Sequence, residues 1–345
     1  MPEAPTAVMP TYGRLPVTFS HGDGAVLYDA EGRPYLDGVS GIAVTNLGHQ
    51  HPRVTEAITE QAKRLVHTSN LFHIGLQEAV ADQLRHITGM ENMFFCNSGA
   101  EANEAGIKLA RRYGHAKGIA APQMIVLEGA FHGRTLGALS ATGNHKIRQG
   151  FGPLLEGFLH VQPNDLSAID RLAAERKDIA SIMVEPIMGE GGIRPLDIDY
   201  LVGLRERCTQ NGWLLIFDEV QTGNGRCGST YVFEQLGVTP DVLLTAKGLG
   251  NGLPIGVCMA RGEAALQLGL GDHGSTYGGN PLCCAAAQAV LTTLTEEPVM
   301  QQADRIRGAL LDAFNDQLAD PSLGTEIRGR GLMIGIQPNT ATDQI

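Results

Sequence analysis

Two charged residues stand where apolar runs end. Lys247 closes the run "DVLLTAK", and glycines follow it at alternate positions, Gly248, Gly250 and Gly252. Asp218 closes "WLLIFD", one strand–helix–strand unit earlier. A lysine amine can form an imine when its surroundings lower its pKa, and a buried carboxylate can stabilise a cation. Taken singly, each residue also fits an ordinary strand end whose charged group reaches water.

A third segment suits a phosphate group. In "CNSGAEANEA", Ser98, Gly99 and Ala100 lie between an apolar run and a helical pattern, so free backbone N–H groups meet the positive end of a helix dipole. The alternative is a plain helix start, with Ser98 as N-cap and Glu101 in a capping box. A lysine imine, a carboxylate for a ring nitrogen and a helix-end phosphate site together describe pyridoxal phosphate. Phe131 suits stacking on the ring, with core packing as the alternative.

These residues need a scaffold that brings them together. From about Val54, helical patterns such as "RVTEAITEQAKRLVH" and "AEANEAGIKLARRYG" alternate with the apolar runs "NMFFCN", "QMIVLEG", "IASIMVEP", "WLLIFDE" and "DVLLTAK". Such runs predict parallel strands covered on both faces, and hence an α/β fold with a doubly wound sheet. Ligands bind at the carboxyl ends of these strands. We therefore expect five strand ends to converge: residues 98–100, residues 131–134, Glu185, Asp218 and Lys247.

The flanking segments predict smaller elements. The stretch "AVLYDAEGRPYLD" predicts a hairpin around Glu31 and Gly32, and "AAAQAVLTTLTEE" predicts a long helix. "TEIRGRGLMIGIQP" then predicts a strand that enters another, smaller domain.

Composition excludes several classes of protein. A formal net charge of -11 argues against a surface for nucleic acid or anionic membranes. The six cysteines form no C-x-x-C pair, and scattered thiols fit a reducing compartment. No window approaches the roughly 18 apolar residues of a membrane span, and "MPEAPTAVMP" lacks the features of a signal peptide. We expect a cytoplasmic protein that binds neither nucleic acid nor a membrane.

Two motifs suggest other functions but fit them poorly. "GNGRCG" (residues 223–228) matches the G-x-G-x-x-G of dinucleotide sites, but it neither ends a strand directly nor opens a clear helix. "GHQHP" places His49 and His51 together without a third ligand at a suitable spacing, so we expect no metal site.

The motifs together resemble the class III, pyridoxal-phosphate-dependent aminotransferases. "FFCNSGAEANEAGIKLAR", "FHGRT", "VEPIMGEGG", "IFDEVQTGNGR", "TAKGLGNGLPIG" and "STYGGNPL" follow the family's order and spacing, within a resemblance from about residue 17 to residue 336. It implies fold type I, with a mostly parallel sheet in a large domain and a smaller α+β domain. The implied parts are an N-terminal segment packing with the small domain (1–55), a large cofactor-binding domain (56–285), and a linking helix with the start of the small domain (286–345).

The resemblance implies roles around the cofactor. Lys247 would anchor pyridoxal phosphate covalently and later move a proton, and Asp218 would keep the ring nitrogen protonated. Thr276 would come from the partner subunit, because the family's sites lie at the interface of a homodimer. The other implied cofactor residues are Ser98, Gly99, Ala100, Phe131, Glu219, Val220 and Gln221.

Within the class, "HTSNLFHI", "CNSGAEANEAGIKLARRYG" and "ALSATGNHKIRQGFGPL" resemble most the enzymes of arginine biosynthesis that act on N2-acetyl-L-ornithine. The implied reaction transfers its δ-amine to 2-oxoglutarate, giving N-acetyl-L-glutamate 5-semialdehyde and L-glutamate. Arg134 would hold a substrate carboxylate, with Ser275 contributing from the partner subunit, and Glu190 would neutralise a second arginine in one half-reaction. The alternatives are a different amine (succinyl-diaminopimelate, succinylornithine, ornithine or 4-aminobutyrate), or a non-catalytic homologue.

The family's chains continue beyond "GLMIGIQP", whereas the tail "NTATDQI" does not resemble their continuation. We therefore expect a truncated small domain that lacks the arginine partner of Glu190. We also expect the strand "LMIGI" to lack sheet partners and to leave an apolar edge exposed. On this expectation the protein binds the cofactor, but is less stable than longer family members and slow with 2-oxoglutarate.

Overall fold

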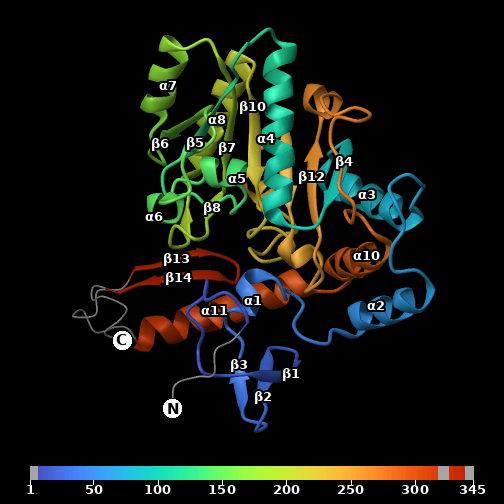
Figure 1. The fold of residues 1–345 in the computed structure, drawn as a ribbon. Coiled ribbons are helices and arrows are strands. Elements are labelled where there is room, and N and C mark those ends of the chain that lie inside the picture. The colour runs from blue at the N-terminus through green and yellow to red at the C-terminus, as the bar shows by residue number, and fades with distance from the viewer. Residues whose placement is uncertain (1–6, 318–325, 339–345) are drawn as a thin grey trace.

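A seven-stranded sheet forms the centre of the molecule (Figure 1). The computed structural model describes residues 7–317 and 326–338. The strand order across the sheet is β4-β12-β11-β10-β7-β5-β6. The strands are β4 (Asn92–Cys96), β5 (Gln123–Leu127), β6 (Phe158–Val161), β7 (Ile179–Val184), β10 (Leu214–Asp218), β11 (Val242–Thr245) and β12 (Gly256–Ala260). The pairs between β11 and β6 are all parallel, which confirms the expected mostly parallel α/β sheet.

The predicted apolar runs include neither β6 nor β12, and β12 is the strand that departs from the parallel arrangement. It pairs antiparallel with both β11 and β4. A short glycine-rich connection returns the chain from β11 to its neighbour, and an antiparallel pair can be joined by such a turn, whereas a parallel pair needs a long crossover. The glycines after Lys247 therefore also turn the chain back into the sheet.

The buried strands alternate their side chains between two hydrophobic cores, as the period of two requires. In β10, Leu214 and Ile216 face the core under α4 (Gly99–Ala116), while Leu215 and Phe217 face the opposite core. Helices α3 (Gly75–Thr88), α7 (Leu166–Glu175), α8 (Ile198–Asn211) and α10 (Pro281–Glu296) contribute to that opposite core. Burying each large apolar side chain contributes about 1.5–3 kcal/mol, so the two cores hold the strand ends firmly in place.

Helix α4 begins at the carboxyl end of β4, as predicted. Ser98 is its N-cap, because its hydroxyl accepts a hydrogen bond from the Glu101 amide at 3.2 Å. The Glu101 carboxylate accepts from the backbone and side chain of Asn97 instead of the Ser98 amide, so the cap is not a reciprocal capping box. Small residues let the helix approach the sheet: a Cβ added at Gly106 would lie 3.2 Å from Leu244 Cδ2.

The N-terminal part forms a separate small sheet. Strands β1 (Phe19–Asp23), β2 (Val26–Asp29) and β3 (Pro34–Leu36) pair antiparallel, and the turn from β2 to β3 is the predicted hairpin around Glu31 and Gly32. Short α1 (Ser40–Ala43) and α2 (Pro52–Arg64) follow. Further short elements of the molecule are α5 (Leu136–Ala141), α6 (His145–Arg148), β8 (Ile187–Met188), β9 (Arg194–Pro195), α9 (Phe233–Leu236), η1 (Lys247–Leu249) and η2 (Gly262–Leu266).

The C-terminal part corrects one expectation. The strand "LMIGI" does not lack a partner, because β14 (Met333–Gln337) pairs antiparallel with β13 (Glu326–Arg330) in a two-stranded hairpin. Arg307 of α11 (Val299–Gln317) donates to the carbonyls of Gly329 and Gly331 and fixes this hairpin to the helix. The expectation was wrong because "TEIRGRG" contains a separate strand, β13, which pairs with β14. The tail "NTATDQI" lies outside the described residues.

No helix in the described ranges, 7–317 and 326–338, is both long and apolar enough to cross a membrane.

Candidate active site

A cavity of about 230 Å³ lies where the sheet's parallel strands end. It receives residues from all five strand ends that the sequence analysis expected to converge. Its lining residues are Gly99, Ala100, Asn103, Phe131, His132, Gly133, Arg134, Glu185, Asp218, Val220, Gln221 and Lys247.

Lys247 lies directly after β11, at the start of the short helix η1. Its φ of 44° is in the left-handed region, which is strained for a residue with a side chain and is typical of functional positions. The half-buried amine has no hydrogen bond or ion pair within the described residues. Burial lowers the pKa of Lys247 below its ordinary value, although the charges of Asp218, Glu185 and Glu190 oppose this effect. More of the amine is therefore free at neutral pH than in an exposed lysine.

Asp218 is buried at the end of β10, with its carboxylate held from three sides. His132 Nδ1 lies 2.8 Å from Oδ2, Asn103 Nδ2 donates to the same oxygen at 2.9 Å, and the Val220 amide donates to Oδ1 at 3.0 Å. These contacts fix the orientation of the carboxylate and compensate for the loss of water around it.

His132 and Asn103 were not predicted as site residues, although both lie inside quoted motifs. Burial alone would lower the pKa of His132, but the hydrogen bond and charge of Asp218, with the charge of Glu185, raise it. His132 Nε2 and Asn103 Oδ1 are buried without any hydrogen-bond partner in the described chain. Buried polar atoms without a partner are rare in proteins. These two atoms therefore favour a polar ligand in this part of the cavity.

Glu185 adds a second buried carboxyl to the cavity wall. Its two oxygens accept from the amides of Phe131, at 2.9 Å, and Gly189, at 3.1 Å. Burial raises the pKa of Glu185, and the nearby charge of Asp218 raises it further, against the effect of His132.

The first turn of α4 forms another part of the wall. The amides of Gly99 and Ala100 begin the helix and, like other first-turn amides, have no acceptor within it. The lack of a side chain at Gly99 lets Val220 pack against the start of the helix, because an added Cβ would lie 2.5 Å from Val220 Cγ1. The positive end of the helix dipole and these amides make this wall suited to an anion.

Phe131 and Val220 provide apolar surface, and Gln221 lies beside Gly189. Arg134 is exposed at the mouth of the cavity, with its guanidinium 5.8 Å from the centre of the Phe131 ring.

Five of the predicted residues do not line the cavity, and one of them, Ser98, is the N-cap of α4. The Glu219 carboxylate is buried elsewhere, accepting from the amides of Val232 and Phe233; burial raises the pKa of Glu219 to about 7. Glu190 is exposed and forms no ion pair in the described part of the chain. Ser275 Oγ bonds Asn97 Nδ2 and the Gly278 amide, and Thr276 is exposed.

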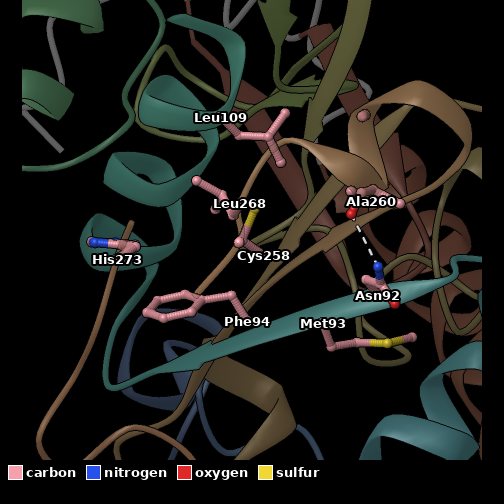
Figure 2. Close-up of a pocket in the computed structure, with 11 residues that line it drawn as sticks. Asn92, Met93, Phe94, Leu109, Cys258, Ala260, Leu268 and His273 are labelled. Carbon is pink, nitrogen blue, oxygen red and sulfur yellow. Dashed lines mark hydrogen bonds between the residues drawn. The ribbon is translucent and has the colours of Figure 1, made fainter. Parts of the chain in front are cut away.

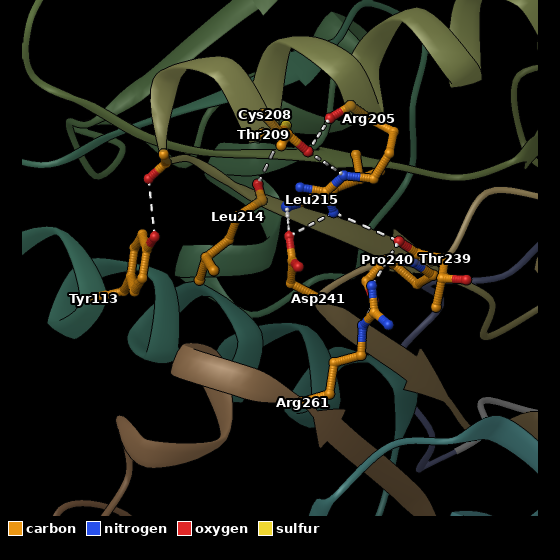
Figure 3. Close-up of polar contacts among 11 residues, drawn as sticks. Tyr113, Arg205, Cys208, Thr209, Leu214, Leu215, Thr239, Pro240, Asp241 and Arg261 are labelled. Carbon is orange, nitrogen blue, oxygen red and sulfur yellow. Dashed lines mark hydrogen bonds and ion pairs between the residues drawn. The ribbon is translucent and has the colours of Figure 1, made fainter.

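Two other cavities are less suited to catalysis. The one in Figure 2, of about 300 Å³, is mostly apolar and lies between β4, β12 and α4. The one around the residues of Figure 3, of about 560 Å³, lies at the opposite end of β10. Its charges satisfy one another: Arg205 pairs with Asp241 at 2.7 Å, and Arg261 donates to the carbonyls of Thr239 and Pro240. Neither cavity contains an unpaired amine.

The structure gives no support for a dinucleotide site at "GNGRCG" or for a metal site at "GHQHP". "GNGRCG" lies in a turn, and the next helix, α9, begins only at Phe233. His49 pairs with Asp37 at 2.8 Å. Within residues 7–317 and 326–338, no group of three or more His, Cys, Asp or Glu residues is placed to hold a metal ion.

The cavity residues fit pyridoxal phosphate. The unpaired Lys247 amine suits covalent attachment, the fixed Asp218 carboxylate suits a protonated ring nitrogen, and the start of α4 suits a phosphate. The unpartnered buried atoms of His132 and Asn103 within the described residues agree with a polar occupant.

Comparisons with known proteins agree with this chemistry. The family described as "Aminotransferase class-III" matches residues 7–344. An acetylornithine aminotransferase of Nitrosomonas europaea is 50% identical over 330 residues, which cover 96% of this chain and 84% of that protein.

Solved structures agree as well. The ornithine aminotransferase of Toxoplasma gondii, described with PLP partially occupying its active site, has a TM-score of 0.92 and 34% identity, and the match covers 96% of this chain and 79% of that one. The N-acetylornithine aminotransferase of Stenotrophomonas maltophilia has a TM-score of 0.81 and 35% identity, covering 96% and 82%. With fold, cavity and relatives in agreement, this chain belongs to the class-III aminotransferases and is a pyridoxal-phosphate-dependent enzyme with the type I fold.

Proposed function

We propose that this aminotransferase moves the δ-amino group of N2-acetyl-L-ornithine to 2-oxoglutarate, giving N-acetyl-L-glutamate 5-semialdehyde and L-glutamate in arginine biosynthesis. The observation that carries the proposal is the 50% identity to a protein named acetylornithine aminotransferase, over 96% of this chain. The ornithine aminotransferase of T. gondii has the higher TM-score but only 34% identity, so free ornithine is the second candidate.

Pyridoxal phosphate, when bound, supplies a carbonyl that accepts an amino group and a ring that accepts electrons. In our proposal the Lys247 amine would hold this group, and the same amine would take up and return a proton at the reacting carbon of the substrate. The depressed pKa supports this role, because the free amine is both the nucleophile and the base.

Asp218 stabilises the protonated ring nitrogen, and its neighbours act through it. His132 and Asn103 hold Oδ2, and the Val220 amide holds Oδ1, so the carboxylate cannot rotate away. We therefore assign His132 and Asn103 as positioning residues for Asp218.

Other residues bind and orient the cofactor. Ser98, Gly99 and Ala100 would hold the phosphate at the start of α4, and Phe131 and Val220 would provide apolar contacts for the ring. Gln221 would offer a hydrogen bond to the cofactor. We assign no direct cofactor contact to the carboxylate of Glu219, because it accepts hydrogen bonds from the amides of Val232 and Phe233.

Arg134 binds a substrate carboxylate. It is exposed at the mouth of the cavity, and no ion pair occupies it among the described residues, which supports this role. An arginine recognises a carboxylate through two parallel hydrogen bonds. Glu190 corresponds to the residue that neutralises a second arginine in one half-reaction. Its charge acts on Lys247, but no arginine pairs with it within the described residues, so we propose that this exchange is impaired.

The enzyme works as a homodimer, with Ser275 and Thr276 serving the partner's cavity. An exposed apolar patch beside them supports this arrangement. Leu71, Phe72 and Tyr277 are 88%, 67% and 63% exposed, and Asn70 Nδ2 bonds the carbonyls of Ser275 and Gly278, both at 3.0 Å, which holds the two segments together. Large exposed apolar side chains gathered in one place are typical of a subunit interface.

The proposed parts of the chain are those of the sequence analysis: an N-terminal segment (1–55), the cofactor-binding domain (56–285), and a linking helix with the start of a small domain (286–345). Figure 1 supports them, because the N-terminal elements lie beside α10 and α11, below the large sheet. A cytoplasmic location is supported by six free, buried cysteines.

A substrate panel tests the amine. Purified, cofactor-loaded protein is given 2-oxoglutarate with N-acetylornithine, ornithine, succinylornithine, succinyl-diaminopimelate or 4-aminobutyrate. We expect the highest kcat/KM with N-acetylornithine. A higher value with ornithine would reassign the substrate while leaving the aminotransferase chemistry intact.

A further inference from the structure

A separate cavity of about 200 Å³ lies between the N-terminal segment, the turn after β10 and helix α11. It shares no lining residue with the active-site cavity. Arg226 lines it, with Asn46 and His51 from the N-terminal segment.

Arg226 is a charged group without a counter-charge. Its Nε and Nη2 both donate to the Asn46 side-chain oxygen, and the second distance is 2.5 Å. Within the described residues Nη1 has no hydrogen bond and the guanidinium has no ion pair. Burial lowers the pKa of Arg226, and the charges of Cys227 and Asp37 oppose this effect. Asp37 is itself paired with His49. Arg226 is partly buried, and charges removed from water are normally paired, so its guanidinium favours an anion in this cavity.

A second polar atom at the cavity is also unused. His51 Nδ1 is buried and has no hydrogen-bond partner in the described chain. Glu297, the acidic residue at the cavity, has its carboxylate 3.5 Å from Arg53. Its negative charge disfavours a second charge on any ligand.

The rest of the wall is largely apolar, formed by Leu47, Leu294, Val299, Ile306 and Leu332. One guanidinium surrounded by aliphatic side chains matches a single carboxylate attached to a short hydrocarbon. A dianion such as phosphate would leave a charge uncompensated in these surroundings. The volume is below the range of about 300–1,000 Å³ for drug-sized ligands, which also limits the occupant to a small molecule.

The cavity is connected to the turn that carries Lys247. Asn46 Nδ2 donates to the Asn224 carbonyl at 3.0 Å, and Asn224 Nδ2 donates to the Ala246 carbonyl at 3.1 Å. Asn46 also packs against Gly248, where an added Cβ would collide with it. An anion held by Arg226 would therefore hold Asn46 against the lysine-bearing turn.

We propose that this cavity is a second ligand site, in which Arg226 binds the carboxylate of a short aliphatic monocarboxylic acid and thereby fastens the N-terminal segment to α11 and to the Lys247 turn.

The test uses sodium butyrate and the cofactor-loaded enzyme. Binding is followed by saturation-transfer NMR on butyrate and by the melting temperature, with sodium chloride and sodium phosphate at equal ionic strength as references. We expect saturable butyrate binding to the unsubstituted enzyme, and binding at least about tenfold weaker in Arg226→Gln. Arg305→Gln, which removes an exposed charge from α11, the helix at the edge of this cavity, should bind butyrate normally.

Two more variants locate the binding. Arg134→Gln should retain butyrate binding, which separates this cavity from the active site. Ala303→Leu fills the cavity at a buried position and leaves Arg226 in place, so it should lose binding even if Arg226→Gln fails to fold. The proposal is overturned if butyrate binds either Arg226→Gln or Ala303→Leu as it binds the unsubstituted enzyme, if binding is lost in Arg134→Gln, or if chloride or phosphate stabilises the enzyme as much as butyrate.

Discussion

Replacing Lys247 with alanine removes the only amine that lines the active-site cavity in the described chain. Transamination should fall to background, because the anchor and the proton carrier are lost together. The start of α4 and Asp218 remain, so the variant should still bind pyridoxal phosphate non-covalently. Steady-state rates and retention of the cofactor on a desalting column would check both outcomes. Turnover near that of the unsubstituted enzyme would refute the assignment of Lys247.

The depressed pKa of Lys247 gives a pH dependence. Only the unprotonated amine attaches the cofactor, and burial lowers the pKa, so the attachment rate should reach its plateau below the ordinary lysine value of about 10.4. Stopped-flow absorbance of the apoenzyme mixed with pyridoxal phosphate measures this rate across pH. Lys247→Ala corrects for reaction at surface amines. A midpoint at or above the ordinary value would contradict the burial argument.

Asp218→Asn keeps the shape of the side chain but removes its charge. One charge pair in a partly buried site is worth several kcal/mol at an effective dielectric constant of about 20, so kcat should fall roughly a hundredfold or more. Circular dichroism should show an intact fold. A loss of less than about threefold would mean that Asp218 does not stabilise the ring nitrogen.

For single residues, the sequence predicts which ones follow a strand, but it does not predict the direction in which their side chains point. Asp218 and Glu219 both follow β10, yet Asp218 lines the cavity and Glu219 bonds the backbone before α9. His132 and Asn103 were missed because their contact with Asp218 joins segments far apart in the chain. The left-handed φ of Lys247 is likewise a product of tertiary packing.

At the scale of elements, the junction between β4 and α4 depends on Gly99. In Gly99→Ala the new Cβ would lie 2.5 Å from Val220 Cγ1 and would push Val220 into the cavity. Affinity for pyridoxal phosphate should fall about tenfold, the size of a modest overpacking penalty. Gly75→Ala, where an added Cβ meets nothing within 4 Å, is the matched control. If both variants bound pyridoxal phosphate with equal affinity, Gly99 would have no role in cofactor binding.

Long apolar runs made β5, β7, β10 and β11 predictable, because their burial on both faces leaves little freedom. Helical spacing predicted α4, whereas the short parallel strand β6 was not predicted. Strand β12 was not anticipated, because "GVCMA" is short and follows the glycine-rich turn closely. The hairpin of β13 and β14 was missed for a related reason: the polar strand "EIRGR" has no apolar alternation, and its pairing with β14 and its contacts with Arg307 define it.

At the scale of the whole molecule, the exposed patch around Leu71 predicts a dimer. Leu71→Glu should shift the protein toward a monomer, because a charge cannot be buried unpaired in an apolar interface. Activity should fall with it, since Ser275 and Thr276 would no longer reach a partner's cavity. Light scattering measures the mass. Leu155→Glu, near the β6 edge of the sheet, is the control and should not change the mass. A Leu71→Glu protein that matches the unsubstituted enzyme in mass and rate would contradict the proposed interface.

The central claim is that one cavity carries an amino group from N-acetylornithine to 2-oxoglutarate. Single-turnover spectroscopy of the cofactor-loaded enzyme tests it most directly. We expect the visible absorbance of the lysine-bound cofactor to disappear when N-acetylornithine is added alone, and to return when 2-oxoglutarate is added afterwards, with glutamate formed in equal amount. If N-acetylornithine leaves the absorbance unchanged, or if the bleached enzyme does not recover with 2-oxoglutarate, the account of this site is wrong.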